Sequence, residues 1–151
     1  MRGQFRGDGI VLENALAFWV NRFYEVSRRA MYRAFRAHDV EVTPEQWLVL
    51  VRLWQKDDRN QRDLAAAIER DAATTSRIID AMERAGLVAR KPDPADARGR
   101  RVVLTAKARK LQGVLVPVVR ELVAAMETGV SDKDLEVTRR TLERLTANLD
   151  G

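Results

Sequence analysis

The sequence predicts a mainly α-helical fold that carries one small β-hairpin, and three observations predict it. Apolar residues recur at the three- and four-residue spacing of amphipathic helices along most of the chain. Thr43-Pro44-Glu45-Gln46 has the residue types of a helix start. Two short strand-like runs flank the Pro- and Gly-containing segment 92–99. At 151 residues we expect one domain, residues 1–151.

The composition limits the class of protein. Charged residues make up 32% and hydrophobic residues 46% of the chain, a balance typical of a folded protein. The net charge of +5 is compatible with an anionic partner such as nucleic acid or a membrane surface. With no cysteine and His38 as the only histidine, we expect no disulfide, no thiol-oxidation sensing, no metal site and no cofactor. No apolar run approaches the roughly 20 residues of a membrane span, so we expect no membrane partner and a cytoplasmic location.

The first predicted helix covers residues 10–38, after a glycine-containing tail (residues 1–9) for which a DNA-contacting arm is the alternative. An amphipathic helix of about 28 residues would span about 42 Å, more than a small domain covers. Part of its apolar stripe therefore needs a second copy of the chain. Trp19, Phe23 and Tyr24 either line a ligand cavity or pack at a core or dimer interface, and we favour the interface.

The second helix begins at a Thr43 cap and a Gln46 capping box, and ends before Lys56. Its Trp47 and Trp54 are seven residues apart, share a face and are predicted to lie in the core. The Asp57-Asp58 pair that follows is predicted to be a solvated loop.

Two capped helices come next, a short one after Asn60 and a second one, residues 72–85, after Asp71. Small and hydroxyl side chains followed by an arginine suit a helix that enters a DNA major groove, although alone they fit any polar helix start. The predicted DNA contacts on this helix are Ala73, Thr74, Thr75, Ser76 and Arg77. Thr75 is also expected on the side of the helix that faces the core.

Gly86 ends this helix, and residues 87–91 and 100–104 are predicted strands joined by a loop over 92–99. Eight basic and two acidic residues lie between Ala89 and Lys110, a net charge of +6. Arg90, Arg98 and Arg100 are added as predicted DNA contacts. Together the elements predict a winged helix-turn-helix DNA-binding lobe, residues 43–104.

The C-terminal third predicts two more helices. Thr105 caps the first, Pro117 should kink it, Gly129 ends it, and Ser131 with Asp134 caps the last helix, which runs to Leu149. With residues 10–38, residues 105–149 are predicted to be dimerisation helices. The fold is thus a winged helix-turn-helix flanked by N- and C-terminal dimerisation helices, with two recognition helices about 34 Å apart.

Asp96-Ala97-Arg98-Gly99 followed by Leu104-Thr105 resembles the wing signature of MarR-type transcriptional regulators. Thr74 to Arg77 with Gly86-Leu87-Val88 resembles their recognition helix and its exit. The resemblance implies a homodimer, usually a repressor, that binds a pseudo-palindromic operator. It implies that Arg98 enters the minor groove and that Asp96 holds it in place. Ala97 and Ala108 depart from the common pattern, where a second basic residue and a glycine are frequent.

The expected function is therefore sequence-specific binding of double-stranded DNA. A winged-helix module for protein–protein assembly is the alternative. No enzyme is predicted, because no nucleophile–base–acid set and no glycine-rich phosphate loop is present. The resemblance also implies release by a small aromatic or phenolic acid, and the candidate ligand residues are Trp19, Arg22, Phe23 and Trp47.

Overall fold

The computed structural model describes residues 5–6 and 9–150, so most of the predicted N-terminal tail or arm lies outside the described residues. The chain divides into two compact units, residues 1–119 and 120–151, which are described separately. A mainly α-helical chain with a small antiparallel sheet confirms the predicted fold class. In the part of the chain that is described, no helix is long and apolar enough to cross a membrane.

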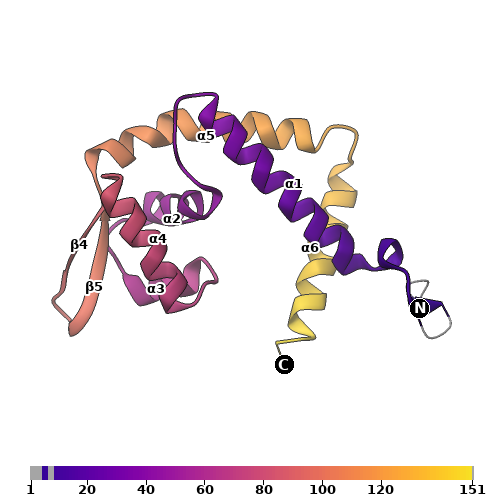
Figure 1. Cartoon of the computed structure of the whole chain (residues 1–151), viewed down its shortest axis with the longest axis horizontal. Helices are drawn as coiled ribbons and strands as arrows, with labels where there is room; N and C mark the ends of the chain where they lie inside the picture. The colour runs from indigo at the N-terminus through magenta and orange to yellow at the C-terminus, as the bar shows by residue number, and fades with distance from the viewer. Residues whose placement is uncertain (1–4, 7–8, 151) are drawn as a thin grey trace. The chain divides into compact units, whose positions relative to one another are not determined.

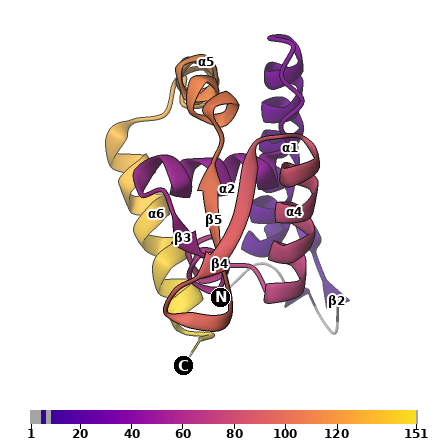
Figure 2. The same cartoon turned by 90° about the vertical axis from the view of Figure 1, so that its left-hand side faces the viewer.

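The first unit holds the helix-turn-helix and the sheet (Figures 1 and 2). Its helices are α1 (Leu16–Arg36), α2 (Pro44–Gln55), α3 (Gln61–Ala67), α4 (Ala72–Arg84) and the first part of α5 (Ala106–Met126). Its sheet has the order β3-β5-β4, formed by β3 (Arg59–Asn60), β4 (Val88–Asp93) and β5 (Asp96–Leu104). Near the N-terminus lie β1 (Phe5–Arg6), β2 (Gly9–Ile10) and a 3-10 turn, η1 (Leu12–Asn14).

The core of this unit is formed by apolar side chains from every one of its longer elements. Phe35 of α1, Leu50 and Leu53 of α2, Leu64 of α3 and Ile79 of α4 are fully buried. Val102 of β5 and Leu115 of α5 close the same cluster. The α3–α4 pair and the β4–β5 hairpin are therefore fixed to one apolar centre, and their outer faces are free for other contacts.

The first helix is shorter than predicted. It begins at Leu16 rather than Ile10, because Ile10 pairs with Phe5 in a short antiparallel ladder and Ala15 is extended. The Trp19 indole N–H donates to the Glu13 carbonyl over 2.7 Å and ties the 3-10 turn to the helix. A helix of 21 residues spans about 31 Å, not 42 Å.

The predicted helix caps are confirmed where the hydrogen bonds are resolved. Thr43 and Gln46 form the full capping box, and Asn60 and Asp71 accept from the first-turn N–H groups of α3 and α4. Gly86 has φ of 68°, and the Leu87 N–H reaches back to the Met82 carbonyl. This Schellman end turns the chain directly from α4 into β4. The Thr105 hydroxyl accepts from the Ala108 N–H at the start of α5.

The predicted loop over residues 92–99 is wrong. β4 runs to Asp93 and β5 begins at Asp96, so the hairpin turns on Pro94 and Ala95 alone. Paired strands extend past Pro92, which stands opposite Arg100 beside an irregularity in the register. The third strand, β3, was not predicted at all; Arg59 pairs with Val102 and Asn60 with Arg101.

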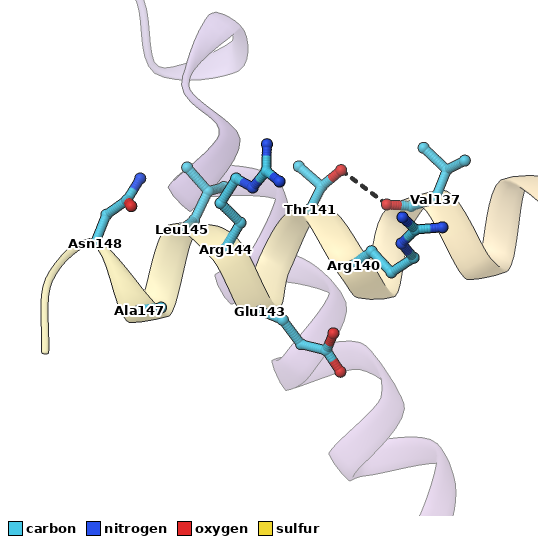
Figure 3. Close-up of a pocket in the computed structure, with 8 residues that line it drawn as sticks. All are labelled: Val137, Arg140, Thr141, Glu143, Arg144, Leu145, Ala147 and Asn148. Carbon is cyan, nitrogen blue, oxygen red and sulfur yellow. Dashed lines mark hydrogen bonds between the residues drawn. The ribbon is translucent and has the colours of Figure 1, made fainter.

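The second unit contains the end of α5 and α6 (Asp132–Ala147). Ser131 caps α6, since its hydroxyl accepts from the Asp134 N–H over 3.1 Å. The helix has no buried residue. Seven of its residues, together with Asn148 after its end, line a surface hollow (Figure 3). Pro117 lies inside α5, and a kink there stays a prediction.

Candidate nucleic-acid interface

The outer face of α4 is built by its N-cap. The Asp71 carboxylate accepts from the Thr74 N–H and the Thr74 hydroxyl, both over 2.7 Å. These bonds, the backbone one first, hold the pKa of Asp71 below its usual range, so the cap is ionised at neutral pH. Arg77 lies exposed one turn on and donates to the Thr74 hydroxyl over 3.3 Å. Ala73, Thr74, Ser76 and Arg77 therefore share an accessible helix face.

Thr75 corrects the predicted contact set. Its side chain is 0% exposed, and its hydroxyl has no hydrogen-bond partner among the described residues. It lies on the same side of α4 as the buried Ile79 and Met82, because residues four and seven positions apart share one face of a helix. Thr75 is a core residue and does not reach a ligand on the outer face.

The wing turns tightly around a buried carboxylate. Asp93 is 7% exposed; one of its oxygens accepts from the Ala95 N–H over 2.9 Å and the other from the Asn60 amide over 2.7 Å. These two bonds lower the pKa of Asp93, the Asn60 bond being the larger cause. A Cβ at Gly99 would stand 3.1 Å from the Cβ atoms of Asp93 and Asp96, so a larger residue there would require these neighbours to shift by a few tenths of an ångström.

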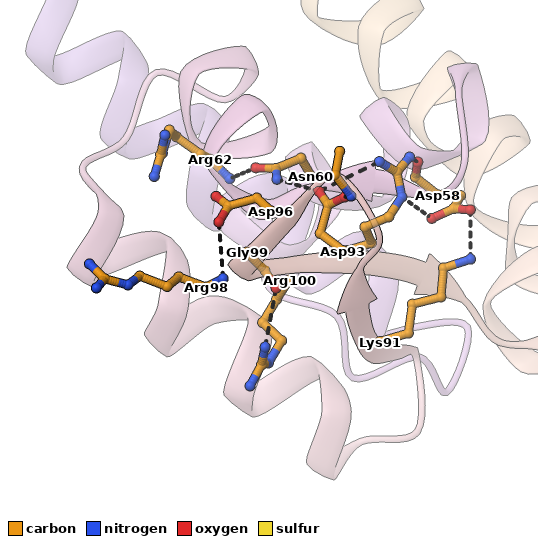
Figure 4. Close-up of polar contacts among 11 residues, drawn as sticks. Asp58, Asn60, Arg62, Lys91, Asp93, Asp96, Arg98, Gly99 and Arg100 are labelled. Atoms are coloured by element: carbon orange, nitrogen blue, oxygen red, sulfur yellow. Dashed lines mark hydrogen bonds and ion pairs between the residues drawn. The ribbon is translucent and has the colours of Figure 1, made fainter.

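Asp96 acts on the backbone of the wing rather than on the Arg98 side chain. Its carboxylate accepts from the Arg98 backbone N–H over 2.9 Å. In Figure 4 the Arg98 guanidinium extends away from this bond. Among the described residues no ion pair joins the two side chains, so the expected clamp on the arginine head is replaced by an Asx-type turn that fixes the direction of the strand.

Three arginines surround a hollow of about 200 Å³ between α3 and the wing tip. Arg98 and Arg100 come from β5, and Arg62 comes from the first turn of α3. Figure 4 shows Arg62 and Arg98 on the same side of the hairpin. All three side chains are exposed. Arg62 was missed from the sequence because it lies 36 residues from Arg98 and belongs to no recognisable motif.

Arg90 is also a correction. Its side chain is 17% exposed and lies among α3, α4 and β4. The guanidinium bonds Asp80 over 2.7 Å, Glu83 over 2.5 Å and Gln61 over 2.8 Å, while the Arg90 backbone N–H donates to Glu83. With its donors used inside the lobe, Arg90 is a cross-link between the recognition helix and the wing and not a DNA contact.

The positive charge of the wing is divided between paired and unpaired cations. Lys91 and Arg101 form ion pairs with Asp58, and Arg109 forms one with Asp57. The Asp57-Asp58 segment is therefore not the solvated loop that was predicted. Within the β4–β5 hairpin, only Arg98 and Arg100 have no ion pair with any described residue, so the hairpin charge available to a polyanion lies at the tip.

The four predicted ligand residues do not meet within one chain. Trp19, Arg22 and Phe23 are exposed on α1, whereas Trp47 packs against Phe35 with ring centroids 5.6 Å apart. Trp19 and Phe35 are separated by 16 helical residues, about 24 Å. A hollow of about 310 Å³ that the sequence did not reveal lies where α1 meets the start of α2. It is lined by Arg28, Arg29, Tyr32, Arg33, Thr43 and Pro44. No group of three or more metal-ligating residues occurs among the described residues.

A three-stranded wing beside a capped helix-turn-helix, with cations at the wing tip, defines a winged-helix DNA-binding protein. The model of the MarR family matches residues 42–99. Residues 42–99 therefore form a MarR-type lobe, and the chain has the winged-helix fold of MarR-family DNA-binding transcriptional regulators.

Solved structures agree with this assignment. A probable transcriptional regulator from Pseudomonas aeruginosa is 26% identical, with 89% of this chain and 99% of that chain covered and a TM-score of 0.79. MepR of S. aureus, solved in a DNA complex, shares the fold at 23% identity, 89% and 96% coverage and a TM-score of 0.77. PcaV of Streptomyces coelicolor, solved with its natural ligand, shares it at 18% identity, 92% and 96% coverage and a TM-score of 0.79.

The different roles of Arg90 and Arg98 can be separated by stability. Arg90→Ala leaves Asp80 and Glu83 without their shared cation, and we expect it to lower the free energy of unfolding by about 2 kcal/mol. Arg98→Ala removes an exposed, unpaired side chain, and the change should stay within about 0.5 kcal/mol. Urea unfolding followed by circular dichroism measures both. Equal stability of the two variants would refute the cross-link.

Proposed function

We propose that the chain acts as a homodimer that binds a pseudo-palindromic DNA site and represses transcription from it. The observation that carries the proposal is the division of charge in the wing, where Arg98 and Arg100 are left unpaired while their basic neighbours are neutralised. A tip with two unpaired arginines suits phosphates or a narrow minor groove. The DNA complex of MepR, which has the same fold, supports this use of the lobe.

In this proposal each part of the outer face has a separate role. Ala73, Thr74, Ser76 and Arg77 of α4 read the major groove, because short side chains allow close approach and Arg77 can donate to a guanine edge. The wing arginines and Arg62 contact the backbone or the minor groove. Hydrogen bonds to phosphate position the protein and those to base edges give specificity.

The homodimer is supported by apolar surface that one copy leaves uncovered. On α1, Trp19 and Phe23 are about half exposed, and Phe23 reaches 56%. On α6, Val137 and Leu145 line the hollow of Figure 3, and Leu149 beyond the helix is 86% exposed. Contiguous apolar patches of this kind mark interaction surfaces. Residues 10–38 and 105–149 remain our proposed dimerisation segments. An assembly module alone would use these same faces but would leave the cations of the wing tip without a role.

We further propose that a small aromatic or phenolic acid releases the DNA, and that the arginine-lined hollow between α1 and α2 binds it. Arg29 and Arg33 supply positive charge there and Tyr32 supplies an aromatic face. Arg28 is already paired with Glu45 over 2.8 Å, and Arg29 is paired more loosely with Glu25 over 3.8 Å. Arg33 has no ion pair with a described residue, so it and the loosely held Arg29 are the arginines that an anion can engage. The ligand complex of PcaV supports effector control in a protein of this fold.

The DNA-binding role of the wing is tested with Arg98→Ala. We expect affinity for a duplex selected from random DNA by the wild-type protein to fall about 5- to 150-fold, and the slope of log affinity against log salt to decrease by about 1. Fluorescence anisotropy at several salt concentrations measures both. Arg36→Ala removes the same charge from an exposed site at the end of α1 and serves as the control. Equal affinities for the two variants would remove the wing from the interface.

The dimer is tested with Phe23→Asp. A charge on this exposed apolar face should leave the fold intact but shift sedimentation towards a monomer, because each buried phenylalanine contributes about 1.5–3 kcal/mol. Asn21→Asp places the same carboxylate two residues away on the same exposed helix and should leave the dimer unchanged. A dimer that survives Phe23→Asp would place the interface elsewhere.

The ligand site is tested with 4-hydroxybenzoate as the probe and neutral phenol as the comparison. The acid should raise the melting temperature of the wild-type protein and release the selected duplex, and phenol should do neither. Arg29→Ala should abolish both effects, whereas Arg22→Ala should retain them. The reverse pattern would move the site to the exposed face of α1 that carries Trp19.

A further inference from the structure

The turn between α2 and β3 holds two acidic residues inside a lobe that binds a polyanion. Asp57 and Asp58, here called the carboxylate clasp, follow the last turn of α2 and precede Arg59. Asp58 has φ of 56°, a left-handed conformation that aspartate and asparagine adopt more readily than most residues. Aspartate at position 58 therefore suits the backbone conformation there.

Asp58 bridges the two strands of the wing at one register position. Lys91 of β4 and Arg101 of β5 stand directly opposite each other in the hairpin. Like charges in such a pair repel and destabilise the hairpin. One Asp58 oxygen accepts from Arg101 over 2.7 Å and the other from Lys91 over 2.6 Å, and Arg101 also donates to the Asp58 carbonyl. Asp58 thus offsets the repulsion between Lys91 and Arg101 by pairing with both.

Asp57 holds the exit of the wing in the same way. One of its oxygens accepts from the Leu104 N–H, the last of β5, over 2.9 Å, and also from the Asp58 N–H over 2.7 Å. Its other oxygen accepts from Arg109 in the first turn of α5 over 2.7 Å. Through Asp57 the end of the wing and the start of α5 share one anchor.

Both carboxylates are charged at neutral pH. Burial raises the pKa of Asp57, but hydrogen bonds from Leu104, Asp58 and Arg109 outweigh it and the net pKa lies below the usual range. Hydrogen bonds from Lys91 and Arg101 lower the pKa of Asp58. The clasp thus keeps two negative charges in the DNA-binding lobe under the conditions in which the lobe meets DNA.

We propose that the carboxylate clasp is a positioning device for DNA binding, which sets the orientation of the wing and so presents Arg98 and Arg100 to DNA. Arg98 lies three residues from Arg101 along β5, about 10 Å in an extended strand. A change in the direction of the strand at Arg101 therefore also changes the position of Arg98 at the tip. The inference rests on the proposed contact between Arg98 and DNA.

For removal of a clasp carboxylate, the proposal predicts a change in DNA affinity opposite to the change that net charge alone predicts. Removing a negative charge from a DNA-binding lobe, and releasing Lys91 and Arg101 from it, should strengthen binding if charge alone mattered. If the clasp positions the tip, the same change weakens binding because the two arginines lose their fixed direction.

The experiment compares Asp58→Asn, Arg98→Ala and the double variant on the duplex selected from random DNA by the wild-type protein. Asn suits the left-handed conformation at this position, and melting curves verify that each variant is folded. Glu69→Gln removes an acidic charge from an exposed site in the same lobe where the side chain has no ion pair with a described residue, and it serves as the control. Asp57→Asn is a second test of the clasp that leaves Asp58 in place.

We expect Asp58→Asn to weaken binding about tenfold and to lower the salt slope by about 1. Asp57→Asn should act in the same direction, and Glu69→Gln should bind as well as the wild type or more tightly. The double variant should bind little worse than Arg98→Ala, since residues that act through one another are not additive. A purely structural effect would give additive losses and an unchanged salt slope.

Tighter binding by Asp58→Asn, or full additivity with Arg98→Ala, overturns the clasp while the contact made by Arg98 stands. An Arg98→Ala variant with wild-type affinity overturns both.

Discussion

Ion pairing inside the DNA-binding lobe decides which of its many cations are free. Arg90, Lys91, Arg101 and Arg109 are each held by aspartate or glutamate, whereas Arg98 and Arg100 are not paired with any described residue. Surface ion pairs are individually weak, but here Asp58 serves two cations on different strands, and Asp80 and Glu83 share Arg90. The location of the charge that the wing offers to a polyanion depends on this pairing.

Local features of the fold could be predicted from the sequence, and features that depend on distant residues could not. The caps at Thr43 and Asp71 join groups three residues apart, so residue type and spacing are sufficient. The Arg101–Asp58 and Arg109–Asp57 pairs join residues 43 and 52 positions apart. The periodicity of the sequence does not indicate such pairs. A net charge counted from the sequence also does not distinguish an arginine in an ion pair from an unpaired one.

The same limit explains the mixed outcome at the candidate site. Helical spacing placed the outer face of α4 well, and it also placed Thr75 inside, although the residue type suggested a contact. Arg90 has the residue type of a DNA contact and the burial of a structural residue. For the ligand, residue types and the family resemblance grouped Trp47 with Trp19, while the length of α1 separates Trp19 from Phe35, which Trp47 contacts. Side-chain chemistry suggests which residues could form a site, but the path of the chain determines which of them lie close together.

The distribution of the three tryptophans gives the molecule built-in optical reporters. Trp47 and Trp54 are half-buried, pack against the core and contact each other with ring centroids 5.6 Å apart, and the Trp54 indole donates to the Ala108 carbonyl. Trp19 lies exposed at the far end of α1, hydrogen-bonded to Glu13. Its emission responds to whatever covers α1, while the inner pair responds to unfolding of the lobe. Intrinsic fluorescence of one unlabelled chain thus distinguishes association from loss of structure.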